Sequence, residues 1–245
     1  MSNIALGTIA SVSAAMGSVL GASIVSSRIK IKDSAVSALL GIAAGVMLSV
    51  TCFSLIVPAF TNGGTIVVVL GIVAGALLLF IVDKTIPHEH QGAGYPDFYA
   101  DSKAVTWLLC AAIIHNIPEG MAVGLGFMNG GDQGVALASG IGFQNILEGI
   151  VLASTLKMVC KPSTRIVGFV VVTTAIEPIM ALMSCSVLTV VPHLTAFLLA
   201  FAAGAMLFIV SSEMVPESHG KGNERFATFG IIVGFVIMMV LNSVL

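Results

Sequence analysis

The sequence predicts an all-α integral membrane protein with eight transmembrane helices. Of its 245 residues, 57% are hydrophobic and only 9% are charged, whereas soluble domains carry about 25% charged residues. So few polar groups cannot cover a surface in water, and lipid is therefore the expected solvent. Because a spanning helix needs about 20 apolar residues, we expect about eight spans in a single transmembrane domain, residues 1–245, with no soluble domain.

Uncharged stretches interrupted by turn-forming or charged residues define the expected spans. The first 27 residues are uncharged and lack the basic region of a cleavable signal peptide, so the first span is expected to be retained. The second and third spans are separated only by the turn signal Thr61-Asn62-Gly63-Gly64. The spans are expected near residues 4–26, 35–59, 64–83, 104–128, 133–156, 164–189, 193–215 and 225–245.

The basic residues predict the orientation. With eight spans, all ten lie in or beside the first, third, fifth and seventh loops: Arg28, Lys30, Lys32, Lys84, Lys103, Lys157, Lys161, Arg165, Lys221 and Arg225. The positive-inside rule places these loops, including loop 85–103, in the cytoplasm and both termini outside it. The expected location is the cell membrane, which is the inner membrane in a Gram-negative cell. A net charge of -2 without a basic patch excludes nucleic acid as a partner.

An internal repeat relates the two ends of the chain. Residues 43–48, in the second span, recur as residues 202–207 in the seventh, and residues 71–75 recur as residues 230–234 in the eighth. Both matches have an offset of 159 residues. The units are five spans apart, an odd number, and therefore cross the membrane in opposite directions. This predicts a 3+2+3 arrangement with inverted repeats in spans 1–3 and 6–8, which is typical of secondary transporters with a site near the midplane.

Few ionisable groups lie inside the expected spans. They are His115, Glu119, Glu148, Glu177 and, toward the inner end of span seven, Glu213, and no Lys or Arg lies at comparable depth. An ionised group at the bilayer centre costs at least about 2.5–3.5 kcal/mol. A passing cation would supply the positive charge that these carboxylates lack. One alternative is a network of helix–helix hydrogen bonds between neutral carboxyls, and another is a proton relay.

The spacing of these groups favours the cation. His115 and Glu119 are four residues apart, on one helix face and about 6 Å along the axis, and Gln144 and Glu148 repeat this arrangement. Pro118 frees a backbone carbonyl at membrane depth, which is tolerated where protein or a polar cavity satisfies it. One imidazole with carboxylates and amides suits zinc, iron or manganese better than copper(I).

Two segments carry a family resemblance. His-Asn-Ile-Pro-Glu-Gly at 115–120, followed by Gln-Asn-Ile-Leu-Glu-Gly at 144–149, resembles the paired signature of the ZIP (Zrt-, Irt-like protein) metal transporters, with the GufA-like branch closest. The resemblance covers the whole chain and implies a binuclear site bridged by Glu119 and Glu148. It implies a first metal on His115, Glu119, Gln144 and Glu148, and a second on Asn116, Glu119, Asn145, Glu148 and Glu177.

The resemblance also implies pathway residues. It suggests an outer gate at Met47, a polar position near the site at Ser54, an inner exit at Asp83 and Glu213, and ion acceptors at Glu217 and His219. Zinc-selective members often carry His where Gln144 stands, and some relatives carry Asp where Asn145 stands. Iron, manganese, cobalt and cadmium therefore remain candidate substrates beside zinc. His88 and His90 are interpreted either as a metal relay or as a solvated pair.

The predicted function is transport of divalent metal ions, zinc first, into the cytoplasm by alternating access. The zinc ion is substrate, and the family implies a homodimer. We do not expect an enzyme, because His115 and Glu119 form HxxxE with a proline between them, and a metalloprotease-like HExxH pair is absent. A proton-coupled carrier of a small organic solute is the alternative, but it leaves four carboxylates without a basic partner.

Overall fold

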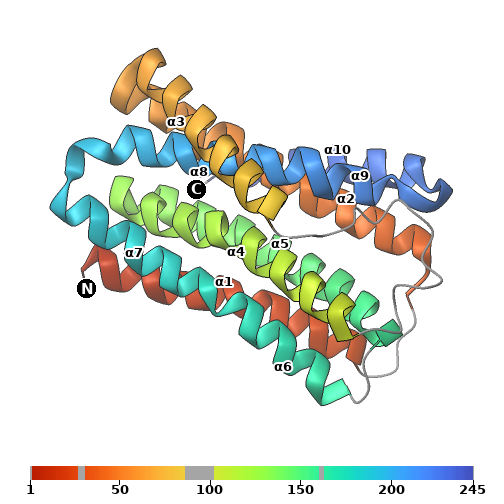
Figure 1. Cartoon of the computed structure of the whole chain (residues 1–245). Helices are drawn as coiled ribbons and strands as arrows, with labels where there is room; N and C mark the ends of the chain where they lie inside the picture. Colours follow the sequence, from red (N-terminus) through yellow and green to blue (C-terminus); the bar gives the residue numbers. More distant parts are fainter. Residues whose placement is uncertain (1, 27–30, 86–101, 160–162, 245) are drawn as a thin grey trace.

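The computed structural model describes residues 2–26, 31–85, 102–159 and 163–244, and every regular element within them is a helix. His88 and His90 lie outside the described residues. The helices are α1 (Asn3–Ser26), α2 (Asp33–Ser49), η1 (Val50–Ile56), α3 (Val57–Thr85), α4 (Ser102–Asn129), α5 (Gly131–Val159), α6 (Ser163–Thr174), α7 (Ile176–Val190), η3 (Pro192–Leu194), α8 (Thr195–Ile209), η4 (Val210–Met214), α9 (Val215–Ser218), η5 (Gly220–Gly222) and α10 (Glu224–Val244) (Figure 1). Both η1 and η4 are π-helices.

Seven stretches of the described residues are long and apolar enough to cross a membrane, and one of them, Asp33–Thr85, has 53 residues. As a straight helix it would extend about 80 Å, more than twice the hydrocarbon thickness. It is broken at Gly64, where φ is 72°, a conformation that glycine adopts without the steric cost of a Cβ. The expected turn between the second and third spans lies at this break, and Figure 1 shows α2 and α3 running in different directions.

Proline has different effects at two positions. The helix α4 runs from Ser102 to Asn129 through Pro118 without interruption. Pro178 instead lies in the first turn of α7, and α6 ends just before it, at Thr174. A proline is tolerated in a first turn because the N–H it lacks has no intrahelical partner there. The break between α6 and α7 places Glu177 in that same first turn.

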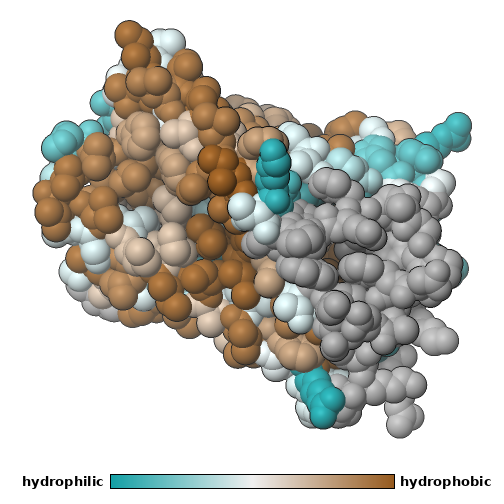
Figure 2. Space-filling view, viewed as in Figure 1, coloured by the Kyte–Doolittle hydropathy of each residue, from teal (hydrophilic) through white to brown (hydrophobic). Residues whose placement is uncertain are grey.

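The surface is apolar over the middle of the molecule. Figure 2 shows hydrophobic side chains over most of the described surface in this view, with hydrophilic ones gathered toward the two ends. Large side chains such as Leu70, Val172 and Phe229 are more than half exposed on α3, α6 and α10. Exposed apolar faces on several helices fit a protein whose solvent is lipid.

The helices pack as two sets. The first set contains α1, α4, α5, α6 and α7, and the second contains α2, η1, α3, α8, η4, α9 and α10 (Figure 1). The most extensive helix pairs form inside these sets: α3 with α8, α2 with α10, α1 with α5, and α4 with α7. Each pair joins helices that the sequence assigns to different units of the expected 3+2+3 arrangement.

Glycines make the close pairs possible, and their contacts recur along the chain. A Cβ at Gly45 would lie 2.0 Å from the Ile231 carbonyl oxygen, and one at Gly204 would lie 2.1 Å from that of Ile72. Gly45 and Gly204 are 159 residues apart, as are Ile72 and Ile231. The α2–α10 contact is therefore repeated as the α8–α3 contact, with the offset that the sequence repeat predicts.

Candidate metal-binding site

Two carboxylates and one amide meet between α4 and α5. The side-chain N–H of Gln144 donates to Glu119 Oε1 at 2.6 Å and to Glu148 Oε1 at 3.0 Å. Glu119 and Gln144 are both fully buried. The two helices are antiparallel, so the HNIPEG and QNILEG segments face each other as the sequence predicts.

Glu177 joins this cluster from the start of α7. The side-chain N–H of Asn145 donates to both carboxylate oxygens of Glu177 at 3.0 Å and to the Ala14 carbonyl at 3.1 Å. Asn116 makes the matching contact on the other side, donating to the Thr173 carbonyl at 3.0 Å. Glu177 has no exposed surface. The structure thus brings together six of the seven expected ligands: Asn116, Glu119, Gln144, Asn145, Glu148 and Glu177.

The seventh expected ligand, His115, points toward the second set of helices. Its Nε2 lies 2.8 Å from Glu213 Oε2 in η4. His115 therefore contacts a residue that the sequence assigns to the inner exit, and it lies on the edge of the cluster. The π-helical turn η4 positions Glu213, and π-helical segments occur frequently at functional sites.

A cavity of about 120 Å³ opens beside His115. Its polar lining includes His115, Asn116, Glu148, Glu213 and Glu217. Glu217 is exposed, so the cavity extends from the buried cluster toward the surface. We call the end of the molecule that it approaches the basic end, because the described residues Lys32, Lys84, Lys157, Arg165 and Arg225 lie at helix ends there.

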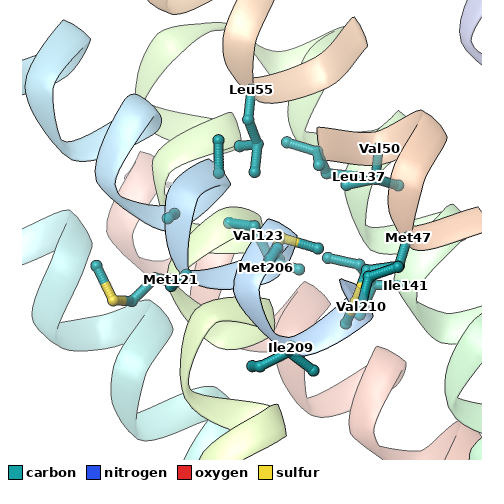
Figure 3. Close-up of a cluster of buried hydrophobic side chains, with 14 of the residues drawn as sticks. Met47, Val50, Leu55, Met121, Val123, Leu137, Ile141, Met206, Ile209 and Val210 are labelled. Carbon is teal, nitrogen blue, oxygen red and sulfur yellow. The ribbon is translucent and has the colours of Figure 1, made fainter. Parts of the chain in front are cut away.

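On the other side of the cluster the protein is densely packed. Figure 3 shows apolar side chains from both sets of helices meeting there, and we call this group the apolar plug: Met47, Val50, Leu55, Met121, Val123, Leu137, Ile141, Met206, Ile209 and Val210. None of these ten side chains is more than 9% exposed. The plug separates the carboxylate cluster from the end opposite the basic end.

Three buried oxygen atoms of the cluster have no hydrogen-bond donor: Glu119 Oε2, Gln144 Oε1 and Asn145 Oδ1. All three are acceptors, and buried acceptors without partners are rare because they lose their hydration. A bound cation would satisfy all three of these acceptors at once. Within the described residues, however, no three His, Cys, Asp or Glu side chains converge as a ready-made metal site. The Gln144 amide lies between the carboxylates of Glu119 and Glu148.

The expected pathway residues have varied surroundings. Met47 belongs to the apolar plug. Ser54, in η1, donates to Asn242 at 3.0 Å, and Asp83 lies half-buried near the end of α3. Both ring nitrogens of His219 make hydrogen bonds, to Val215, Ser218 and Thr228. His219 therefore joins α9 to α10 and does not line the cavity.

The cavity also contains polar residues that the sequence reasoning missed. Ser18, Thr155, Thr173 and Thr174 all line it. Hydroxyl residues are common in membrane helices, so their type alone gives no signal. The repeat, however, could have identified one of them, because Ser18 stands 159 residues before Glu177.

Comparison with known proteins identifies the family. The ZIP Zinc transporter family matches residues 88–242. The chain is 36% identical over 219 residues to zinc transporter ZIPB of Bordetella bronchiseptica, covering 85% of this chain and 71% of that protein. It is 35% identical over 202 residues to zinc transporter GufA of Myxococcus xanthus, covering 78% and 79%, and 26% identical over 241 residues to zinc transporter ZupT of Corynebacterium glutamicum, covering 90% and 92%. The paired signature, the buried carboxylates and these similarities agree: the chain belongs to the ZIP family of transporters and is not an enzyme.

Proposed function

We propose that this protein carries divalent metal ions, zinc first among them, across the cell membrane into the cytoplasm. The observation that carries the proposal is the set of three buried acceptor oxygens on Glu119, Gln144 and Asn145 that lack donors. Carboxylate and amide oxygens with one imidazole form a donor set for zinc, iron or manganese. The relatives named as zinc transporters support zinc as the principal substrate.

The ligands are proposed residue by residue. The first ion is held by His115, Glu119, Gln144 and Glu148, and the second by Asn116, Glu119, Asn145, Glu148 and Glu177. Rotation of the Gln144 amide would turn its unpaired Oε1 toward an ion and release the two carboxylates to coordinate it. Rotation of His115 away from Glu213 would bring its ring to the same ion. The contacts among these residues support a site assembled by side-chain rotation.

The proposed topology has eight crossings with both termini outside the cytoplasm. The break at Gly64 supports two crossings within Asp33–Thr85. The close pairs α1–α5 and α2–α10 each pack parallel. In the proposed order α1 and α5 are the first and fifth crossings, and α2 and α10 are the second and eighth. Each pair should therefore cross in the same direction, which the parallel packing supports. The basic end then faces the cytoplasm by the positive-inside rule. The homodimer is proposed on the family resemblance alone.

The proposed mechanism is alternating access, and the cavity and the plug support it. The residues of α4 and α5 correspond with an offset of 29, as His115 corresponds to Gln144. By this rule the cavity residues Leu108, Ala112 and Leu152 correspond to the plug residues Leu137, Ile141 and Val123. Equivalent positions thus form an open cavity toward the basic end and a closed plug toward the other. Exchange of these two arrangements between the equivalent positions of α4 and α5 would close the cavity and open the plug side.

The experiment compares zinc bound by purified protein with zinc uptake into liposomes. Wild type is compared with Glu119→Ala and Glu148→Ala, and Glu224→Gln, at the start of α10, is the matched control. We expect both site variants to lose binding and flux and the control to keep both. Equal binding and flux in all four proteins would refute the proposed site, and flux of an organic solute without zinc flux would favour the alternative carrier.

A further inference from the structure

Ser18 and Glu177 occupy equivalent positions next to the two bridging carboxylates. Gly120 directly follows Glu119, and a Cβ there would lie 2.2 Å from the Glu177 carbonyl oxygen. Gly149 directly follows Glu148, and a Cβ there would lie 2.1 Å from the Ser18 carbonyl oxygen. The backbone of α1 at Ser18 therefore approaches α5 as the backbone of α7 at Glu177 approaches α4.

A second, independent contact fixes the same correspondence. Asn116 donates to the Thr173 carbonyl, and Asn145 donates to the Ala14 carbonyl. Thr173 lies four residues before Glu177, and Ala14 lies four residues before Ser18. Both the glycine contacts and the amide contacts therefore equate Ser18 with Glu177.

The two positions differ in depth and in surroundings. Because α4 and α5 are antiparallel, Glu177, which contacts Gly120, lies on the plug side of the cluster. Ser18, which contacts Gly149, lies on the cavity side. Glu177 is fully buried and held by Asn145. Ser18 is 4% exposed and lines the cavity together with Glu148, and its hydroxyl makes no hydrogen bond to another side chain within the described part of the protein.

We propose that the Ser18 hydroxyl is a transit ligand for the metal ion on the cytoplasmic side of the site, an inference that rests on the proposed function. On the plug side the ion is held by the charged oxygens of Glu177. On the cavity side the equivalent position offers one neutral oxygen on a shorter side chain. A site with fewer charged ligands binds a divalent ion more weakly. The Ser18 hydroxyl thus coordinates the ion transiently as the ion moves from Glu148 toward Glu213.

The test measures binding and movement of zinc ions separately, in the full-length protein. Zinc bound at equilibrium is measured after dialysis, the dissociation rate by stopped flow into excess chelator, and the initial uptake rate in liposomes. The variants are Ser18→Ala, which removes the oxygen, Ser18→Cys, which restores a ligand atom, and Ser18→Glu, which adds the missing carboxylate. Ser11→Ala is the matched control, since Ser11 is buried on the same helix and does not line the cavity.

We expect Ser18→Ala to bind zinc as wild type does but to transport it about fivefold more slowly. The free energy of one neutral polar contact corresponds to a change in rate of this size. Ser18→Cys should recover most of that rate. Ser18→Glu should release zinc about fivefold more slowly, because the free energy of a contact with a charged ligand is about twice that of a contact with a neutral one. Ser11→Ala should behave as wild type.

Wild-type uptake by Ser18→Ala, or wild-type release by Ser18→Glu, would overturn the role of Ser18. Glu119→Ala in the same assays distinguishes failure of the Ser18 proposal from failure of the proposed function. If Glu119→Ala loses zinc binding while the Ser18 variants behave as wild type, the proposed site stands and only the transit ligand is wrong. If Glu119→Ala also binds and transports zinc normally, the proposed function itself fails.

Discussion

Gln144 donates one buried N–H to Glu119 at 2.6 Å, and the same nitrogen lies 3.0 Å from Glu148. A single neutral amide therefore links the two carboxylates that are proposed to bridge the metals. Its own oxygen has no donor. The amide can turn, so this contact couples the arrangement of both carboxylates to whether an ion is bound.

Replacing Gln144 with His should raise the preference for zinc. The imidazole adds a nitrogen ligand, which suits zinc, whereas manganese is better matched by oxygen ligands. We expect the ratio of zinc to manganese affinity, measured by competition in purified protein, to rise about tenfold, as one improved ligand contact of about 1.4 kcal/mol would give. An unchanged or lower ratio would show that the amide does not coordinate the ion. Asn3→His, at the exposed start of α1, is the control.

Zinc binding should release protons, and acid should weaken it. Metal ligands must be deprotonated, so proton and metal compete for the buried carboxylates and for His115. Adding zinc to weakly buffered protein should lower the pH, and the zinc affinity should fall as the starting pH is lowered. Glu177→Gln removes one competing carboxyl, which the proposal assigns to the second ion only, and should release fewer protons per bound zinc. No pH change on zinc binding would contradict carboxylate or imidazole ligation.

Gly45 and Gly204 should be equally sensitive to substitution by alanine. A methyl group at Gly45 or Gly204 would lie about 2 Å from a backbone carbonyl on the partner helix, and overpacking of this kind costs about 1–3 kcal/mol. Gly45→Ala and Gly204→Ala should therefore lower the midpoint of thermal unfolding in detergent by similar amounts. Gly168→Ala is the control, because its Cβ would meet open space. Clearly unequal losses would argue against equivalent contacts in the two repeats.

Gln133 should hold the plug side closed. Its side-chain N–H donates to the Ser54 carbonyl in η1 at 2.6 Å, and Asn62 donates to Asn129 at 3.0 Å, so both hydrogen bonds join the two sets of helices. Gln133→Leu removes a contact of about 1 kcal/mol, which shifts a two-state population about fivefold.

The shift can be measured by labelling a single cysteine placed at Ile141 in a cysteine-free protein, with a membrane-impermeant reagent added outside. Labelling should become faster in Gln133→Leu and should not change in Thr61→Ala, whose hydroxyl bonds only locally, to Pro58. Equal labelling rates in both would mean that the Gln133 contact does not stabilise the closed plug.

Much of the site follows from sequence because it depends on local spacing. The separation of His115 from Glu119 and of Gln144 from Glu148 fixes which side chains share a helix face, and burial without basic partners limits what can neutralise them. The turn at Gly64 was also predictable, since Asn62-Gly63-Gly64 favours the backbone conformation found there. The break before Glu177 follows from Pro178.

Other features depend on which helices become neighbours. The sequence predicts repeats of three helices, and the structure adds that α2 packs on α10 and α3 on α8, which join one repeat to the other through their glycine faces. His115 was expected among the metal ligands but lies against Glu213, because η4 brings that carboxylate to the first set of helices. No spacing along the chain encodes either contact.

The sequence alone indicated the solvent of this protein through its composition, and its family through the resemblance of the segments at 115–120 and 144–149 to the paired signature. It also predicted, from positions within single helices, which ionisable residues lie near the middle of the spans. Only the tertiary structure decided which side of the cluster is open and which is closed, and that Ser18 faces the cavity where Glu177 is sealed. The reason is physical: the two repeats have related backbones, and the size and polarity of side chains from several helices together determine whether a position fills with apolar atoms or remains a cavity.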